Sequence, residues 1–324
     1  MRVMLLRRSA RGGLAALTDD LAAWLPQLGF SVIVEDATWI PRETGRAVDR
    51  DVSRRLRDMG DAFDLLHAFG YRAAWACAEA FADEFFWLYS AYEAAPQSKL
   101  LIDRLNLAGL GICASIHTRN SLFGQGVQSL DQVYPGVSAG AGARLGREET
   151  RRLLGIPEDA FLVGSFRDDG LVAMFAEIPD CWFVLGERDS PRWHATNEET
   201  ASDPENVKRV GWFPRPRDLM EACDLWLAPD RDRGYVRNVA EAMYEGTPVL
   251  VRDSAREMVE EDVSGFVFAS DDALPGRILE IRDLDLTRQT IGAAGRIRAR
   301  ELFDMELRVA DVAQRYRDLV NEAL

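Results

Sequence analysis

The sequence predicts an α/β protein built from two domains, each with a parallel sheet. The chain has 324 residues. One hydrophobic core rarely organises that many, so we expect two domains of roughly 150 residues each. Short apolar runs alternate along the chain with segments of helical periodicity, and glycine-containing turns separate them. Strands that alternate with helices in this way are typical of βαβ units and of parallel sheets.

Composition and charge describe an ordinary globular protein and exclude several partners. Hydrophobic residues make up 47% of the chain, charged residues 28%, and the formal net charge is −14. Such an acidic chain is a poor match for nucleic acid, because phosphate backbones require clustered cationic side chains. No apolar run is long enough for a signal peptide or a transmembrane segment, which predicts a cytoplasmic protein. The cysteines have no paired spacing, so we expect buried free thiols at Cys77, Cys113, Cys181 and Cys223.

The first half opens with a strand, a glycine turn and a helix. The run RVMLL at residues 2–6 is typical of a buried strand, and residues 14–28 repeat apolar side chains at helical spacing until Gly29. A second strand follows at residues 30–36. Between the first strand and the helix, Gly12 and Gly13 would let the backbone approach a ligand without a Cβ in the way. An ordinary tight turn explains the two glycines equally well.

Two further apolar runs, residues 64–70 and 85–96, predict the next strands. His67 lies near the end of the first run. A histidine at the carboxyl end of a parallel strand either faces the crevice where such sheets bind ligands or is a hydrogen-bonded structural residue. Tyr92 lies near the end of the second run. Tyrosine can donate a hydrogen bond, but its reference pKa of about 10 makes it a poor base at neutral pH.

The glycine-rich stretch from Val137 to Gly146 predicts a linker between the two domains. A helix at residues 147–154 then opens the second half, followed by strands at 161–166, 182–187 and near 207–210. The turn after the first of these strands contains Arg167 and two neighbouring aspartates. Trp212 and Phe213, after the last of them, are either a stacking face for a nucleotide base or part of the core.

The run from Asp224 to Val251 is the most informative part of the chain. An apolar run ends at Pro229, Gly234 marks a turn, and residues 238–245 read as a helix that Gly246 closes before the next strand. A loop that ends at a helix N-terminus offers unpaired N–H groups and a positive dipole end. These groups suit a phosphate or a sugar hydroxyl.

This run resembles the donor-sugar motif of the retaining glycosyltransferases of family 4, which have the GT-B fold of two Rossmann-like domains facing across a cleft. The residue pairs and triplets Gly234-Tyr235, Glu241-Ala242-Met243 and Gly246-Thr247-Pro248 keep the family's spacing. Arg233 holds the place of the family's first acid, and Val236 that of a small residue. The resemblance extends over nearly the whole chain. It implies an N-terminal acceptor-side domain at 1–137, a linker at 138–146, and a nucleotide-sugar domain with closing C-terminal helices at 147–324.

The resemblance also assigns roles to residues. Glu241 would accept hydrogen bonds from the ribose hydroxyls, because a carboxylate can accept two in one plane. Arg167 is the candidate arginine of the diphosphate clamp, although Asp168 and Asp169 stand where its lysine partner belongs. Arg233 is either a solvated loop charge or a replacement cation for the diphosphate. The candidate catalytic residues are His67 and Arg233. The candidate donor-binding or nucleotide-binding residues are Gly12, Gly13, Arg167, Trp212, Gly234, Tyr235 and Glu241.

The activity implied is hexosyl transfer, with retention, from a nucleotide-sugar co-substrate to a glycan, lipid or small-molecule acceptor. Neither a metal nor a further cofactor is expected. Two alternatives remain open. The chain is a degenerate relative that binds a nucleotide, a sugar or a partner protein without turnover, or it is another two-domain enzyme such as a sugar epimerase.

Overall fold

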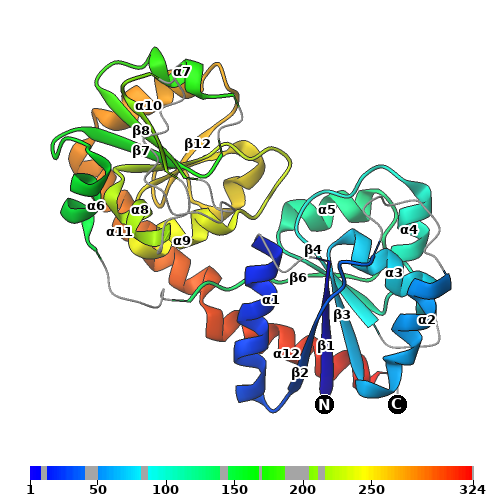
Figure 1. Cartoon of the computed structure of the whole chain (residues 1–324). Coiled ribbons are helices and arrows are strands. Elements are labelled where there is room, and N and C mark those ends of the chain that lie inside the picture. The colour runs from blue at the N-terminus through cyan, green and yellow to red at the C-terminus, as the bar shows by residue number, and fades with distance from the viewer. Residues whose placement is uncertain are drawn as a thin grey trace. The chain divides into compact units, whose positions relative to one another are not determined.

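The computed structural model describes residues 1–8, 13–40, 50–81, 87–138, 145–167, 170–186, 204–210 and 216–322. The chain divides into two compact units, each with a parallel six-stranded sheet and flanking helices (Figure 1). Unit 1 comprises Met1–Gly136, Arg233–Tyr235 and Asp304–Leu324, and unit 2 comprises Val137–Asp232 and Val236–Phe303. The α/β architecture that the sequence predicts is confirmed.

The sheet of unit 1 has the strand order β2-β1-β3-β4-β5-β6, and every neighbouring pair is parallel. Its strands are β1 (Arg2–Arg7), β2 (Ser31–Asp36), β3 (Leu65–Phe69), β4 (Trp87–Ala91), β5 (Leu110–Cys113) and β6 (Leu130–Gln132). Strands β3 and β4 are buried along their whole length, because helices cover both faces of the sheet. The order of the chain through the sheet reverses between β1 and β3. Open parallel sheets bind ligands outside the carboxyl ends of their strands at such a reversal.

Helices pack on both faces of the unit 1 sheet. One face carries α1 (Gly13–Trp24), the 3-10 turn η1 (Leu25–Leu28) and the C-terminal helix α12 (Met305–Asn321). The other face carries α2 (Arg50–Asp58), α3 (Tyr71–Phe81), α4 (Lys99–Leu105) and α5 (Ile116–Gly124), with η2 (Gly60–Ala62) between α2 and β3. Two apolar clusters, one on each face, form the core.

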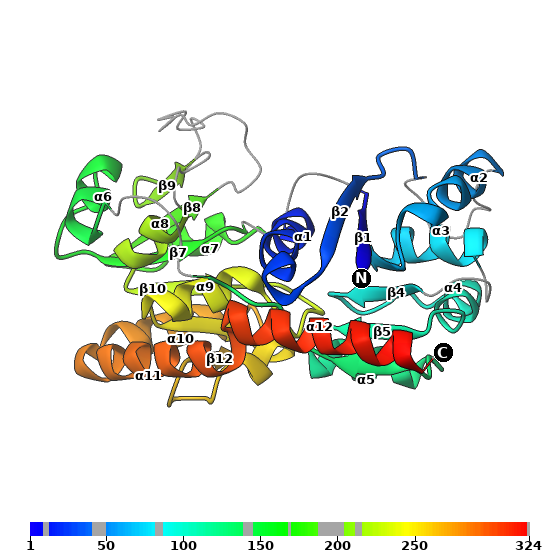
Figure 2. The same cartoon turned by 90° about the horizontal axis from the view of Figure 1, so that it is seen from below.

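The place of α12 differs from the expected domain boundaries. We expected residues 147–324 to form one domain, but α12 clusters with unit 1. Its side chains Val309, Ala313 and Tyr316 are at most 2% exposed and pack against β1, β3 and β5. The apolar stripe of α12 is therefore complementary to the unit 1 sheet, and Figure 2 shows the helix beside β5 of that unit.

The sheet of unit 2 has the order β12-β11-β10-β7-β8-β9, again with parallel pairs only. Its strands are β7 (Phe161–Ser165), β8 (Cys181–Gly186), β9 (Val207–Val210), β10 (Leu225–Ala228), β11 (Val249–Arg252) and β12 (Phe266–Phe268). The chain reverses direction through this sheet between β7 and β10. The turn after β7 and the loop after β10 therefore leave the sheet at the predicted ligand-binding edge.

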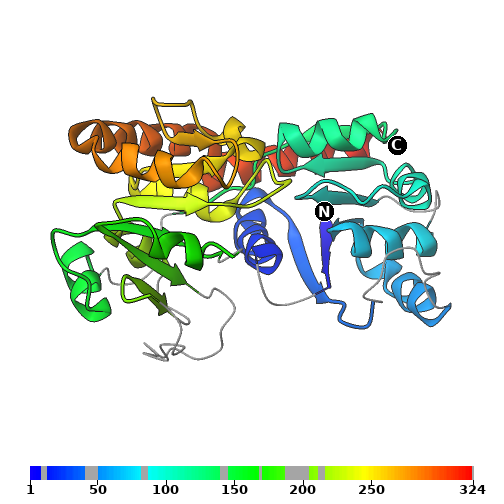
Figure 3. The same cartoon turned by 90° about the horizontal axis from the view of Figure 1, so that it is seen from above.

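The helices of unit 2 are α6 (Arg147–Leu154), α7 (Val172–Ala176), α8 (Pro216–Ala222), α9 (Arg237–Glu245), α10 (Leu274–Arg282) and α11 (Asp285–Phe303), with the 3-10 turn η3 (Asp253–Met258). Helices α10 and α11 lie side by side, as Figure 3 shows. Helix α11 also packs closely on the end of α9, where a Cβ at Gly292 would overlap the carbonyl oxygen of Gly246. This contact fixes the C-terminal end of α9, which is opposite to the end that follows the loop after β10.

Two smaller expectations concern the cysteines and the membrane. Cys77, Cys113, Cys181 and Cys223 are free and buried, as expected. In the described part of the chain, no helix has both the length and the apolar character that crossing a membrane requires.

Candidate functional site

Helix α9 and the loop before it form the centre of the candidate site in unit 2. The helix begins at Arg237, one residue before the predicted start, and ends at Glu245, where we expected it to end. Gly246 adopts the left-handed conformation with φ 86°, which favours glycine and closes the helix. At the other end, the Trp226 indole donates a hydrogen bond of 3.2 Å to the Asn238 side chain. That bond anchors the first turn of α9 on strand β10.

Glu241 lies one turn into α9 and is 6% exposed. The Nε atom of Arg237, four residues earlier, donates a hydrogen bond of 2.7 Å to the Glu241 Oε1 atom. Such a charge-assisted bond between two mostly buried groups restricts the carboxylate to one orientation. The structure therefore presents Glu241 as a pre-oriented hydrogen-bond acceptor near the start of a helix.

Arg167 lies at the same edge of the unit 2 sheet as the loop that leads to α9. Strands β7 and β10 are hydrogen-bonded neighbours in which Trp226 pairs with Gly164. Arg167 follows β7, and its side chain is exposed. Its backbone N–H donates to the Ser165 hydroxyl oxygen at 3.1 Å, which fixes the turn. The two predicted donor segments therefore follow neighbouring strands of the sheet.

For several of the predicted site residues, the structure gives little or no description of the surroundings. Gly12, Trp212 and the aspartates at 168 and 169 fall outside the described part of the chain. Gly13 is the first residue of α1. The roles that we assigned to these residues remain predictions.

Arg233, Gly234 and Tyr235 cluster with unit 1. The Tyr235 hydroxyl donates a hydrogen bond of 3.1 Å to the Pro135 carbonyl oxygen. An Nη2 atom of Arg233 lies 3.1 Å from the Glu93 carboxylate, and the two side chains are 43% and 55% exposed. An exposed ion pair contributes little free energy because water and salt screen it. Arg233 can therefore exchange Glu93 for another anion at small cost.

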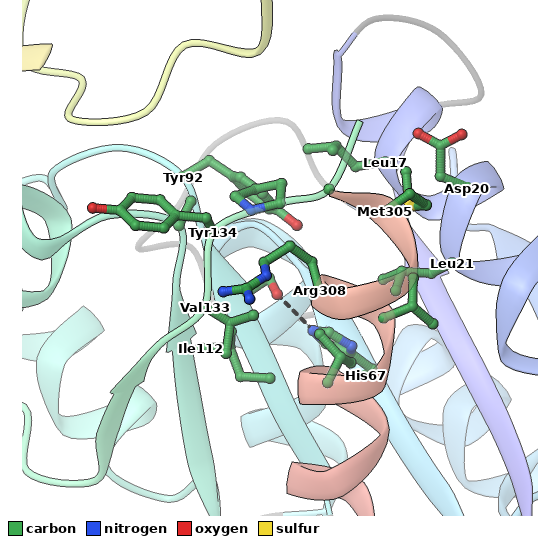
Figure 4. Close-up of a pocket in the computed structure, with 16 residues that line it drawn as sticks. Leu17, Asp20, Leu21, His67, Tyr92, Ile112, Val133, Tyr134, Met305 and Arg308 are labelled. Atoms are coloured by element: carbon green, nitrogen blue, oxygen red, sulfur yellow. Dashed lines mark hydrogen bonds between the residues drawn. The ribbon is translucent and has the colours of Figure 1, made fainter. Parts of the chain in front are cut away.

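His67, the other predicted catalytic residue, is completely buried in unit 1. Its Nδ1 atom lies 2.6 Å from the Tyr316 hydroxyl on α12, and its Nε2 atom lies 2.7 Å from the Ser90 hydroxyl on β4. Burial of the ring lowers the pKa of His67 to about 3. The dashed line at His67 in Figure 4 marks the second of these hydrogen bonds. At neutral pH the side chain is uncharged and both of its nitrogens are in use.

The cavity that His67 lines is small. Leu17, Asp20, Tyr92 and Arg308 are among the residues that line it, and its volume is about 30 Å³ (Figure 4). A water molecule occupies about that volume in the liquid, so a sugar does not fit. Of the two interpretations of His67, the structure favours the hydrogen-bonded structural residue. The sequence contains no signal for its partner Tyr316, which lies 249 positions away.

A comparison with known protein families gives a match within unit 2. Residues 163–282 match the family model "Glycosyl transferases group 1". This range contains Arg167, the loop after β10 and Glu241. No curated protein gives a match to the sequence.

Solved structures resemble the chain over nearly its full length. HepE from Anabaena, in complex with UDP and glucose, has a TM-score of 0.79 at 19% identity and covers 98% of this chain and 99% of its own. Sucrose-phosphate synthase from Thermosynechococcus elongatus has a TM-score of 0.77 at 17% identity, with 99% of each chain covered. A glycosyltransferase from Rickettsia africae ESF-5 has a TM-score of 0.78 at 11% identity, with 98% of each covered. The predicted GT-B fold of two Rossmann-like domains is thereby confirmed.

Proposed function

We propose that this protein is a glycosyltransferase that moves a sugar from a nucleotide-sugar donor to an acceptor hydroxyl, with retention of configuration. One observation carries the proposal. The segment that matches the group 1 glycosyltransferase family contains a buried, pre-oriented carboxylate, Glu241, one turn into the helix that follows the ligand-binding edge of the unit 2 sheet. Structures of HepE contain UDP and UDP-glucose. Uridine nucleotides are therefore the first donors to test.

In the proposed mechanism, Glu241 accepts hydrogen bonds from the ribose hydroxyls of the donor. The N–H groups at the start of α9, together with Arg167, stabilise the negative charge that develops on the departing diphosphate. Arg233 is the candidate for a further cation on the diphosphate. The acceptor hydroxyl attacks the anomeric carbon on the face that the diphosphate leaves. A new bond from the anomeric carbon to the acceptor oxygen replaces the bond to the diphosphate, and the hydroxyl proton passes to the departing diphosphate. No metal and no cofactor take part.

A second candidate function is nucleotide or sugar binding without turnover. Two features favour it, because they concern the predicted catalytic residues. An arginine stands at position 233 in place of the family's acid, and His67 is completely buried in unit 1. Calorimetric titration with UDP, GDP and ADP, followed by an assay of donor hydrolysis, separates the two functions. Binding with hydrolysis supports the transferase, and binding without hydrolysis or transfer supports the non-catalytic protein. Absence of binding to all three nucleotides would contradict both.

Replacing Glu241 with alanine is expected to weaken UDP binding by about 1–3 kcal/mol, the range for a hydrogen bond to a charged group. The dissociation constant should rise by roughly 5-fold to 150-fold, as measured by calorimetry. Exposed Glu177 in the same unit provides the control, since Glu177→Ala should leave the affinity unchanged. If Glu241→Ala lowers only the melting temperature and the folded fraction still binds UDP normally, Glu241 packs α9 and does not contact the nucleotide.

Replacing Arg233 with alanine is expected to lower the affinity for UDP by about 10-fold or more and to leave the affinity for uridine nearly unchanged. Only UDP presents the charged oxygens that a guanidinium pairs with. Arg233→Glu should weaken UDP binding further, because it places a carboxylate near the phosphates. Both ligands are titrated into the wild type and the two variants.

The ion pair with Glu93 supplies a matched control for this experiment. Glu93→Ala removes the same ion pair but leaves the Arg233 cation in place. It should therefore retain UDP affinity. Equal losses for uridine and UDP in Arg233→Ala, or the same loss in Glu93→Ala, would contradict a direct contact between Arg233 and the diphosphate.

A further inference from the structure

We infer that a cavity in unit 1 binds a phosphate group, and that this phosphate belongs to the sugar acceptor. The second half of the inference rests on the proposed function. The cavity has a volume of about 420 Å³, and Arg7, Arg8, Gly70, Arg72 and Glu93 are among the residues that line it. Small-molecule sites usually have volumes of about 300–1,000 Å³. The cavity lies where β1 and β3 end, at the reversal of strand order, which is the edge where open parallel sheets bind ligands.

Two of the charged residues in the wall are already neutralised by neighbours. The Arg7 guanidinium lies 2.6 Å from both the Asp19 and the Asp36 carboxylates. The Glu93 carboxylate is paired with Arg233 at 3.1 Å. Neither Arg7 nor Glu93 is therefore left with an uncompensated charge that would attract a ligand.

Arg72 is the residue best placed to hold an anion. It lies in the first turn of α3 and is half-buried. Across the described ranges, its guanidinium makes neither a hydrogen bond nor an ion pair, in contrast to Arg7 beside it. The planar fork of an arginine matches two phosphate oxygens at once. An arginine in a cavity wall that has no partner among the described residues is consistent with a ligand that supplies the missing anion.

The start of α3 adds backbone donors at the same place. The first helical bond runs from the Ala74 N–H to the Gly70 carbonyl, so the preceding N–H groups of the first turn have no acceptor within the helix. Gly70, with φ +83°, has no side chain that could cap them. The positive end of the α3 dipole and the Arg72 cation are therefore both available to one anion in the cavity.

These donors favour phosphate over carboxylate. A phosphate monoester carries a charge of about −1.5 to −2 at neutral pH and has three strong acceptor oxygens, so it can contact the guanidinium and the helix N–H groups together. The carboxylate of Glu93, which also lines the cavity, can accept hydrogen bonds from hydroxyls. The class of acceptor that fits is therefore a small hydroxylated molecule with a phosphate monoester.

The test is a calorimetric titration of the full-length protein, without a nucleotide donor, with glucose 6-phosphate, glucuronate and glucose. We expect glucose 6-phosphate to bind most tightly, and Arg72→Gln to weaken its binding by about 10-fold or more. Arg72→Lys should retain part of the affinity, because it keeps the charge and loses the fork. The surface residue Arg55 provides the control, since Arg55→Ala should bind like the wild type. Binding should also slow amide hydrogen exchange in the first turn of α3.

Three results would overturn the inference. The first is equal binding of glucose 6-phosphate by wild type and Arg72→Gln. The second is a loss in Arg167→Ala with none in Arg72→Gln, which would place the phosphate in unit 2. The third is tighter binding of glucuronate than of glucose 6-phosphate. Binding of vesicles that contain phosphatidic acid, if Arg72→Gln abolishes it, identifies the same phosphate chemistry on a lipid acceptor.

The same measurements distinguish this inference from the proposed function. If UDP, GDP and ADP all fail to bind while glucose 6-phosphate binds through Arg72, the phosphate site stands and only its role as an acceptor site falls. If UDP binds through Glu241 while no phosphate ester responds to Arg72→Gln, the transferase stands and the acceptor is not a phosphate ester.

Discussion

Replacing Arg151 with leucine is expected to destabilise unit 2 by about 3–5 kcal/mol, the usual effect of breaking a buried ion pair by removing one partner. Arg151 is 2% exposed. Its guanidinium donates to the carbonyl oxygens of Ala222, Glu158 and Ala160, and to the Asp224 carboxylate at 2.7 Å. Leucine fills much of the volume but leaves these acceptors without donors. Each buried carbonyl without a donor costs about 1–3 kcal/mol.

This change is measured by denaturant unfolding together with hydrogen exchange of the strands β7 and β10. Asp224 stands immediately before β10 and also accepts a bond from the Leu162 N–H in β7, so both strands should lose protection. Arg152 is the matched control, because it lies next in the chain and pairs with Glu149 at the surface. Arg152→Leu should leave the unfolding midpoint unchanged. Similar behaviour of the two leucine variants would contradict the structural role of Arg151.

Acidification is expected to destabilise unit 1 through His67. Burial lowers the pKa of the folded His67 to about 3, whereas an unfolded histidine has a pKa of about 6.5. Between these two values the unfolded chain binds a proton that the folded chain does not, so the free energy of unfolding falls as the pH falls. The stabilising contribution is complete above the unfolded pKa. It decreases by about 1.4 kcal/mol per pH unit within that window.

The variant His67→Gln separates this contribution from that of the carboxylates. Glutamine keeps hydrogen-bonding groups for Ser90 or Tyr316 but does not titrate. Unfolding is followed by hydrogen exchange of β3, β4 and α12 at a series of pH values, and the difference in slope between wild type and variant reports His67 alone. If both proteins lose protection with the same pH dependence, His67 is already accessible to protons in the folded state.

Glycine residues that end helices explain why these element boundaries could be predicted. Helices α6 and α9 both end at the predicted residue, because Gly155 and Gly246 adopt the left-handed conformation with φ 66° and 86°. A glycine that closes a helix acts through its own backbone and needs no distant partner. The same holds for the loop before α9, whose residue types and spacing predicted a strand, a turn and a helix in the order that the structure contains.

The chemistry of the predicted site residues depends on distant neighbours. The sequence identified Glu241 but not its hydrogen bond to Arg237, although residues four apart on a helix lie on one face. It identified Arg233 as a departure from the family pattern but not its partner Glu93, which is 140 positions away. Arg72 reads in the sequence as an ordinary helical arginine. Only the position of α3 at the reversal of strand order places its side chain in the wall of a cavity.

The sequence by itself therefore determined the α/β class, the two parallel sheets, the order of their elements and the segment that matches the glycosyltransferases. These properties follow from the periodicity of apolar residues and from turn-forming glycines, which act over a few residues. Only the tertiary structure decided that His67 is sealed between Ser90 and Tyr316, and that α12 packs on unit 1. It also decided which arginines have partners. Burial and ion pairing arise between segments that come into contact only when the chain folds. A local sequence pattern does not indicate which segments these are.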